Sequence, residues 1–141
     1  MDKLTQQETL RLITLDSRKS DRGNLVFWEN AKLFPSGIQR CFWISDVPTN
    51  VSRGSHAHWQ ESQVLVAIHG EIKVMVHRPG QEVHTFVLDE SDTGLFIPPL
   101  HWVETQFGEK AVLLVLSDQA YSEDDYIRNI KDFESIQEGN H

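Results

Sequence analysis

The sequence predicts an all-β domain of the sandwich or barrel type. Three observations support this fold class: apolar and polar residues alternate over short runs, turn residues separate these runs, and helical periodicity is confined to the C-terminal part. The chain has 141 residues, a length typical of one domain. It carries no internal repeat, low-complexity tract or linker. We therefore predict a single domain over residues 1–141.

The strands are expected in the following order. Residues 10–15, 25–29 and 40–45 supply the first three. The clearest alternation covers 63–88, which has the pattern of a meander with turns at Gly70 and at 78–81. Three more strands are expected, and the last is a nearly continuous apolar run that indicates burial on both faces. They cover 94–97, 102–107 and 111–117.

The C-terminal part predicts one short helix. Ser122 precedes the acidic run 123–125, which is typical of an N-cap and a first helical turn. Tyr126, Ile130 and Phe133 then recur at three to four residues. We therefore expect a helix from about 123 to 136, with its apolar face docked on the sheets.

Composition excludes several classes of protein. Thirteen Lys and Arg residues against 21 Asp and Glu leave a net charge of −8, so no sequence-wide basic surface indicates nucleic acid or an anionic membrane. Cys41 is the only cysteine and cannot form an intramolecular disulfide. The chain opens on a charged segment unlike a signal peptide, and no apolar run approaches the ~20 residues that cross a bilayer. These features predict a cytoplasmic protein.

The strongest local motif is the run 53–58, with the sequence Arg-Gly-Ser-His-Ala-His. On an extended strand, residues two apart point the same way, so His56 and His58 can present both imidazoles to one cavity. A neutral imidazole can accept and return a proton, or it can bind a metal ion. The alternative is a hydrogen-bonded pair with no chemical role.

Together with Gly70, this run resembles the first cupin motif, in which a later acidic residue completes a metal site. Here Ser62 and Gln63 occupy the region of that residue, and a neutral amide is a poor ligand for a transition metal. If a metal did bind, its ligands would be His56, His58, His101 and Glu61. We expect a site without metal or other cofactor.

A second resemblance extends over most of the chain. It rests on the order and spacing of segments 21–25, 38–40, 53–58 and 125–128, with Glu29, Gln63, Pro98, Pro99, Trp102 and Glu104. Together these residues resemble the sugar 3,4-ketoisomerase family of WxcM-like cupins. The resemblance implies a cupin-type jelly-roll barrel, assembled as a homodimer, in some members with an exchanged N-terminal strand. It also implies that a dTDP-4-keto-6-deoxyhexose is converted to the 3-keto sugar without metal, in deoxysugar and polysaccharide biosynthesis.

The resemblance also implies roles for individual residues. One histidine, preferably His56, removes the proton at C3 and returns it at C4 through an enediol or enediolate, and His58 moves the proton between O3 and O4; the two roles can be exchanged. Arginine suits phosphate oxygens, aromatic rings stack on the base or hexose, and polar side chains bind sugar hydroxyls or orient a neighbour. The substrate-binding residues implied in this way are Arg22, Glu29, Arg40, Trp43, Arg53, Gln63 and Trp102.

Two departures from the family pattern bear on the product. Phe42 and Trp43 stand where relatives often carry two tyrosines, and Val103 stands where relatives carry a polar or basic residue. Both changes affect groups that can deliver a proton. Two alternative functions remain: a nucleotide-sugar 3- or 5-epimerase, which needs a similar base beside a ketone, and a non-catalytic sugar-nucleotide-binding cupin module.

Overall fold

The computed structural model describes residues 9–136. This part of the chain is built almost entirely from β-strands, as predicted. The strands are β1 (Arg11–Thr14), β2 (Asp16–Ser20), β3 (Gly23–Phe27), β4 (Arg40–Ile44), β5 (Ser52–His58), β6 (Gln63–His69), β7 (Ile72–His77), β8 (His84–Leu88), β9 (Thr93–Ile97), β10 (Trp102–Phe107), β11 (Val112–Ser117) and β12 (Tyr126–Ile127).

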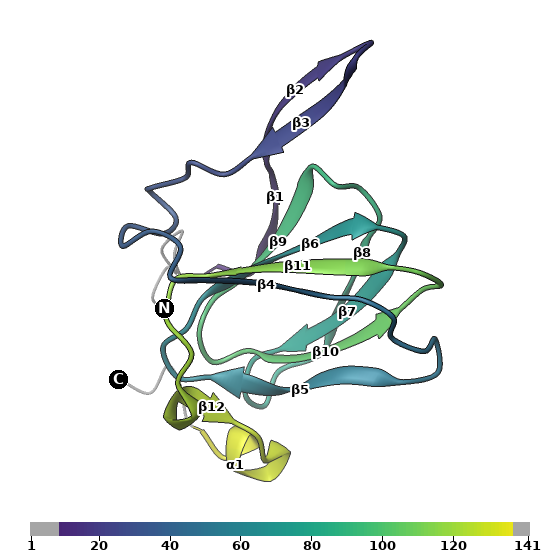
Figure 1. Ribbon diagram of the computed structural model, residues 1–141. Helices are drawn as coiled ribbons and strands as arrows, with labels where there is room; N and C mark the ends of the chain where they lie inside the picture. The colour runs from purple at the N-terminus through teal and green to yellow at the C-terminus, as the bar shows by residue number, and fades with distance from the viewer. Residues whose placement is uncertain (1–8, 137–141) are drawn as a thin grey trace.

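Two five-stranded antiparallel sheets face each other (Figure 1). The first has the strand order β1-β9-β6-β11-β4, and the second has the order β12-β5-β10-β7-β8. Neighbours in a sheet are mostly distant in sequence, as in a jelly roll. The predicted jelly-roll class is confirmed, although the two sheets form a sandwich and do not close into a barrel.

The predicted meander over 63–88 is correct at its second turn and wrong at its first. Strands β7 and β8 form a hairpin, but β6 lies between β9 and β11 in the opposite sheet. The chain changes sheet at Gly70, whose φ of +73° and lack of a side chain allow its backbone to approach Ala111. Alternation within each strand does not reveal such a crossing.

Apolar side chains fill the space between the sheets. Ile72, Val74 and Leu95 are fully buried there. A second cluster covers the outer face of the first sheet, where Phe34 from the loop after β3 packs near Val64 and Phe96. This second cluster explains why β6 is buried on both faces.

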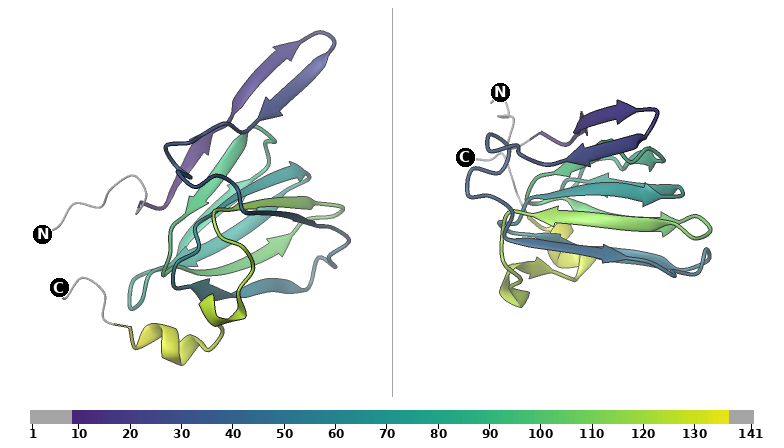
Figure 2. Two further views of the ribbon diagram at one scale, coloured as in Figure 1. Left: turned by 60° about the vertical axis from the view of Figure 1, so that its left-hand side comes forward. Right: turned by 45° about the horizontal axis from the view of Figure 1, so that its top comes forward.

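Strands β2 and β3 form a two-stranded hairpin that projects from the sandwich (Figures 1 and 2). Strand β2 has the sequence Asp-Ser-Arg-Lys-Ser and is mostly exposed, so no apolar alternation could predict it. The hairpin turns at Asp21 and Arg22 and returns through Gly23, whose φ is +127°.

The predicted helix over 123–136 is wrong in its extent. Residues Glu123–Asp125 form a 3₁₀ turn, β12 then pairs with β5, and helix α1 covers only Ile130–Glu134. The helix starts late because the Asn129 side chain caps it, accepting bonds from the backbone NH groups of Lys131 and Asp132. Its buried residue, Phe133, packs against Trp102. None of the described helices is long and apolar enough to cross a membrane.

Candidate functional site

A cavity of about 260 Å³ lies between the two sheets. One wall comes from β4, β6 and β11, and the other from β5 and β10, with β12 and the following residue completing it. Apolar side chains such as Phe42 and Val115 line the first wall, whereas the second wall carries Arg53, His56 and Arg128. Such an apolar cavity with a few converging polar groups is the usual form of a small-molecule site.

A β-bulge aims His56 into this cavity. Arg53 pairs with Thr105 and Gly54 with Glu104, but the next residue of β10, Val103, pairs with His56. Strand β5 therefore has one extra residue at this point. Strict alternation would have turned Ser55 towards the cavity, and the extra residue turns His56 towards it instead. The bulge requires positive φ angles at Gly54 (+97°) and Ser55 (+58°). Without it, the imidazole would face away from the cavity.

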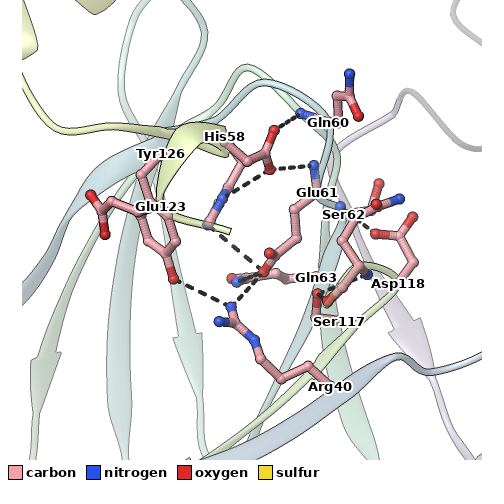
Figure 3. A network of polar contacts seen from close by, with 12 residues as sticks. Arg40, His58, Gln60, Glu61, Ser62, Gln63, Ser117, Asp118, Glu123 and Tyr126 are labelled. Atoms are coloured by element: carbon pink, nitrogen blue, oxygen red, sulfur yellow. Dashed lines mark hydrogen bonds and ion pairs between the residues drawn. The ribbon is translucent and has the colours of Figure 1, made fainter. Parts of the chain in front are cut away.

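His58 points to the same side as His56 but lies outside the cavity lining. Its ring packs on the ring of Tyr126, with centroids 4.3 Å apart, and meets the ring of His56 edge-on at 5.1 Å. Nδ1 is 3.4 Å from Asp125 Oδ2 and Nε2 is 3.8 Å from Glu61 Oε2. His58 therefore belongs to a polar network behind the cavity wall (Figure 3).

The centre of this network is the buried carboxylate of Glu61. Arg40 forms an ion pair with it at 2.9 Å, and the side-chain amide of Gln63 donates a hydrogen bond to the same oxygen. The Arg40 guanidinium also donates to the Tyr126 hydroxyl at 3.3 Å and packs over the ring of Phe42. A buried carboxylate needs such partners because its desolvation is costly.

Two further carboxylates clamp the loop that carries Glu61. Asp125 accepts hydrogen bonds from the backbone NH groups of Gln60 and Glu61 at 2.8 and 3.0 Å, and Asp118 accepts one from Ser62 at 2.8 Å. The C-terminal segment therefore fixes the turn between β5 and β6.

Both histidines are held as neutral imidazoles. Burial is the main cause that lowers the pKa of His56 to about 4, and the neighbouring His58 adds to the effect. Burial also lowers the pKa of His58 to about 4, against the opposing charge of Asp125. Positive charge also lowers these pKa values, from Arg128 for His56 and from both Arg40 and Arg128 for His58.

The structure brings some of the predicted site residues together. Arg53, His56 and Gln63 line the cavity, while Arg40 and His58 lie in the adjoining network.

Four predicted substrate contacts lie elsewhere in this chain. Trp43 follows the inward Phe42 and therefore faces outward, with 69% of its surface exposed. Trp102 precedes the inward Val103, packs on Phe133 and donates its indole NH to Glu104. The other two, Arg22 and Glu29, are exposed on the β2–β3 hairpin and on the loop that follows it.

The metal ligand set considered from the sequence is not assembled. Within residues 9–136, the group whose ligand atoms lie within 4.8 Å of one another is His58, Glu61 and Asp125. The side chain of His101 instead approaches the carbonyl oxygens of Pro98 and Pro99, at 3.2 and 2.9 Å. The Arg40 guanidinium already neutralises Glu61, which disfavours a second cation there.

Two residues of the cavity wall were missed as site residues. Tyr126 and Arg128 both line the cavity, and the guanidinium lies 4.2 Å from the centre of the Tyr126 ring. The expected helix assigned Tyr126 to a packing face. Asn129 is the sequence feature that could have indicated the correct helix start, because a helix capped at this residue leaves 126–128 free to form a strand.

Comparison with known proteins gives matches over most of the chain. Residues 8–138 match the family described as WxcM-like, C-terminal, with the name FdtA. A curated relative from Aneurinibacillus thermoaerophilus, TDP-4-oxo-6-deoxy-alpha-D-glucose-3,4-oxoisomerase, is 36% identical over 113 residues, covering 79% of this chain and 81% of the relative.

Two solved structures are similar over nearly the whole fold. A mutant of the 3,4-ketoisomerase QdtA from Thermoanaerobacterium thermosaccharolyticum, in complex with TDP-4-keto-6-deoxyglucose, is 33% identical with a TM-score of 0.83, covering 89% of this chain and 91% of that one. The TDP-quinovose 3,4-ketoisomerase WlaRB from Campylobacter jejuni is also 33% identical, with a TM-score of 0.82 and coverages of 89% and 96%.

Proposed function

The chain belongs to the WxcM-like, C-terminal family, and we propose that it is an isomerase that moves the ketone of a dTDP-linked 4-keto-6-deoxyhexose from C4 to C3. The relatives described above are named as 3,4-ketoisomerases of TDP-sugars, which supports the reaction and the substrate class. The observation that carries the proposal in this chain is a neutral imidazole, His56, directed into a cavity between the sheets.

His56 is the base in this proposal. Moving the ketone requires that a proton leaves C3 and that a proton arrives at C4, and one imidazole between these adjacent carbons can do both. Its low pKa keeps the ring unprotonated at neutral pH, so it is ready to accept the C3 proton. His58 supports it from behind the wall through the contact between the two rings.

Arg53 and Arg128 are the cations that we assign to the diphosphate. Both line the cavity, and a guanidinium fork matches phosphate oxygens. Arg128 is held by Glu123 through hydrogen bonds of 2.6 and 2.9 Å, which fixes the direction of its side chain. Gln63 remains the candidate for a sugar hydroxyl. The proposal assigns no step to a metal ion, because an uncharged imidazole supplies the base directly.

The test is incubation with dTDP-4-keto-6-deoxyglucose in deuterated water, followed by NMR. We expect the carbonyl at C3, deuterium at C4, and loss of turnover in His56→Ala, while His84→Ala, an exposed residue of β8, serves as the matched control. Treatment with a chelator should leave turnover intact. A carbonyl that stays at C4, with the configuration at C3 or C5 inverted, would instead identify an epimerase. Tight binding without deuterium incorporation would identify a binding module.

We also propose that the protein is a cytoplasmic homodimer. Trp43 is largely exposed on the outer face of β4, an edge strand, and exposed tryptophan is typical of protein interfaces. The projecting β2–β3 hairpin carries Arg22 away from the cavity of its own chain, so a substrate contact of Arg22 would require a second copy. Mixing inactive Arg22→Ala with inactive His56→Ala would then restore activity, because one site of each mixed dimer has both native residues. Monomers in light scattering would contradict the dimer.

A further inference from the structure

The proposed isomerisation moves a proton between the two sugar oxygens as well as between the two carbons. The sequence suggested His58 for the first task, but His58 does not line the cavity. We propose that the Tyr126 hydroxyl transfers this proton and that Tyr126 is a second catalytic residue beside His56. This inference rests on the proposed isomerase function and deepens it.

The other polar groups of the cavity wall suit the task poorly. Arg53 and Arg128 carry guanidinium groups, which donate hydrogen bonds but do not give up a proton in proteins, so they cannot move a proton between the sugar oxygens. The Gln63 amide does not titrate, and its NH₂ group is bound to Glu61. These three side chains can bind the substrate but cannot act as proton donors in turnover.

The remaining possible proton donors in the cavity wall are side-chain hydroxyl groups. Among the described residues that line the cavity, only Thr105 and Tyr126 carry one. The Thr105 hydroxyl donates to the backbone oxygen of Arg53 at 3.1 Å, and an aliphatic alcohol is a far weaker acid than a phenol. Phe42, on the facing wall, has no hydroxyl. Tyr126 is therefore the remaining donor.

The surroundings of Tyr126 fit a group that gives up and regains a proton. Arg40 donates a hydrogen bond to its oxygen, which leaves the hydrogen of the phenol free for another acceptor. The same guanidinium places a positive charge beside the oxygen when the phenolate forms. The ring lies 5.1 Å from that of His56, so the base and the phenol can reach adjacent carbons of one hexose.

The two residues together complete the reaction without an oxidant or reductant. His56 takes the proton from C3, the electrons of that C–H bond form the C3–C4 double bond, and the π electrons of the C4 carbonyl move onto O4 to give an enolate. O4 then takes the proton of Tyr126, giving an enediol and a Tyr126 phenolate. The Tyr126 oxygen then takes the proton from O3, the carbonyl forms at C3, and C4 takes the proton from His56. Both residues return to their starting protonation states.

The test compares Tyr126→Phe with His84→Ala in deuterated water. His84 is exposed on β8 and does not line the cavity, so this variant is a control that should keep full turnover. In Tyr126→Phe we expect kcat for ketone migration to fall by about 100-fold or more, with TDP affinity changed little. His56 can still remove the C3 proton, so exchange of deuterium into C3 of the recovered substrate should fall much less.

This ratio of C3 exchange to isomerisation separates a chemical role from a structural one. A collapsed wall would reduce both rates together and weaken TDP binding, and that result would overturn the inference. Retention of wild-type kcat in Tyr126→Phe would overturn it as well. A wild-type protein that does not isomerise the substrate would refute the proposed function itself, which is a different result from either of these.

Discussion

Replacing Gly54 with alanine should destabilise the protein and impair His56 at the same time. An added Cβ would lie 2.7 Å from the backbone oxygen of Val103 and 3.4 Å from Glu104 Cα, and these atoms belong to the neighbouring strand β10. The positive φ of Gly54 costs a residue with a side chain about 1–2 kcal/mol. Forcing the strands apart adds about 1–3 kcal/mol. The expected loss of unfolding free energy is therefore about 2–5 kcal/mol.

Gly80→Ala is the matched control for this change. Gly80 also has a positive φ (+69°), but no atom lies within 4 Å of an added Cβ, so only the conformational cost of about 1–2 kcal/mol applies. Urea denaturation of both variants at one protein concentration measures the difference. Equal losses would refute the close approach of β5 and β10. A destabilised Gly54→Ala protein with native kcat would refute the claim that the bulge aims His56.

Three more predictions concern the stability of the site. The free energy of unfolding should fall as the pH drops from 6.5 towards 4, by about 1.4 kcal/mol per pH unit for each of His56 and His58. The cause is that the two imidazoles take up protons in the unfolded chain but not in the folded protein, where they are buried. Urea denaturation measures this change, and a free energy of unfolding that stays constant over this range would contradict the lowered pKa values. Phe133→Ala should cost about 3 kcal/mol, since the ring is fully buried against Trp102, and thermal unfolding measures it. Asp125→Asn should cost about 1–3 kcal/mol in urea denaturation, because one oxygen that accepts a backbone NH becomes an NH₂ group; native stability would show that the loop clamp is dispensable.

Alternation of apolar residues was sufficient to predict most strands, because each strand buries one face between the sheets. It failed for β2, which is exposed and polar, and at Gly70, where the chain changes sheet. Strand pairing depends on contacts across long sequence separations, and local patterns carry no information about them. The helix at 123–136 was wrong because Tyr126 pairs with β5, and this tertiary contact prevails over helical spacing.

The site could be predicted only where it follows from local geometry. The spacing of His56 and His58 correctly placed both rings on one side of β5. Which ring reaches the cavity depends on the bulge and on Tyr126, which comes from the other end of the chain. Trp43 and Trp102 do not line the cavity of this chain, because each is one residue away from an inward position and a shift of one residue along a strand reverses the face.

The pairing of early strands with late ones has a consequence for biosynthesis. Strand β4 pairs with β11, and β5 pairs with β10 and β12, so a nascent chain lacks the partners of both strands until most of it has left the ribosome. Contacts of this kind make folding slow, and unpaired edges promote aggregation in the meantime. The cavity beside His56 lacks Tyr126 and Arg128 from its wall until residues 125–128 have been translated.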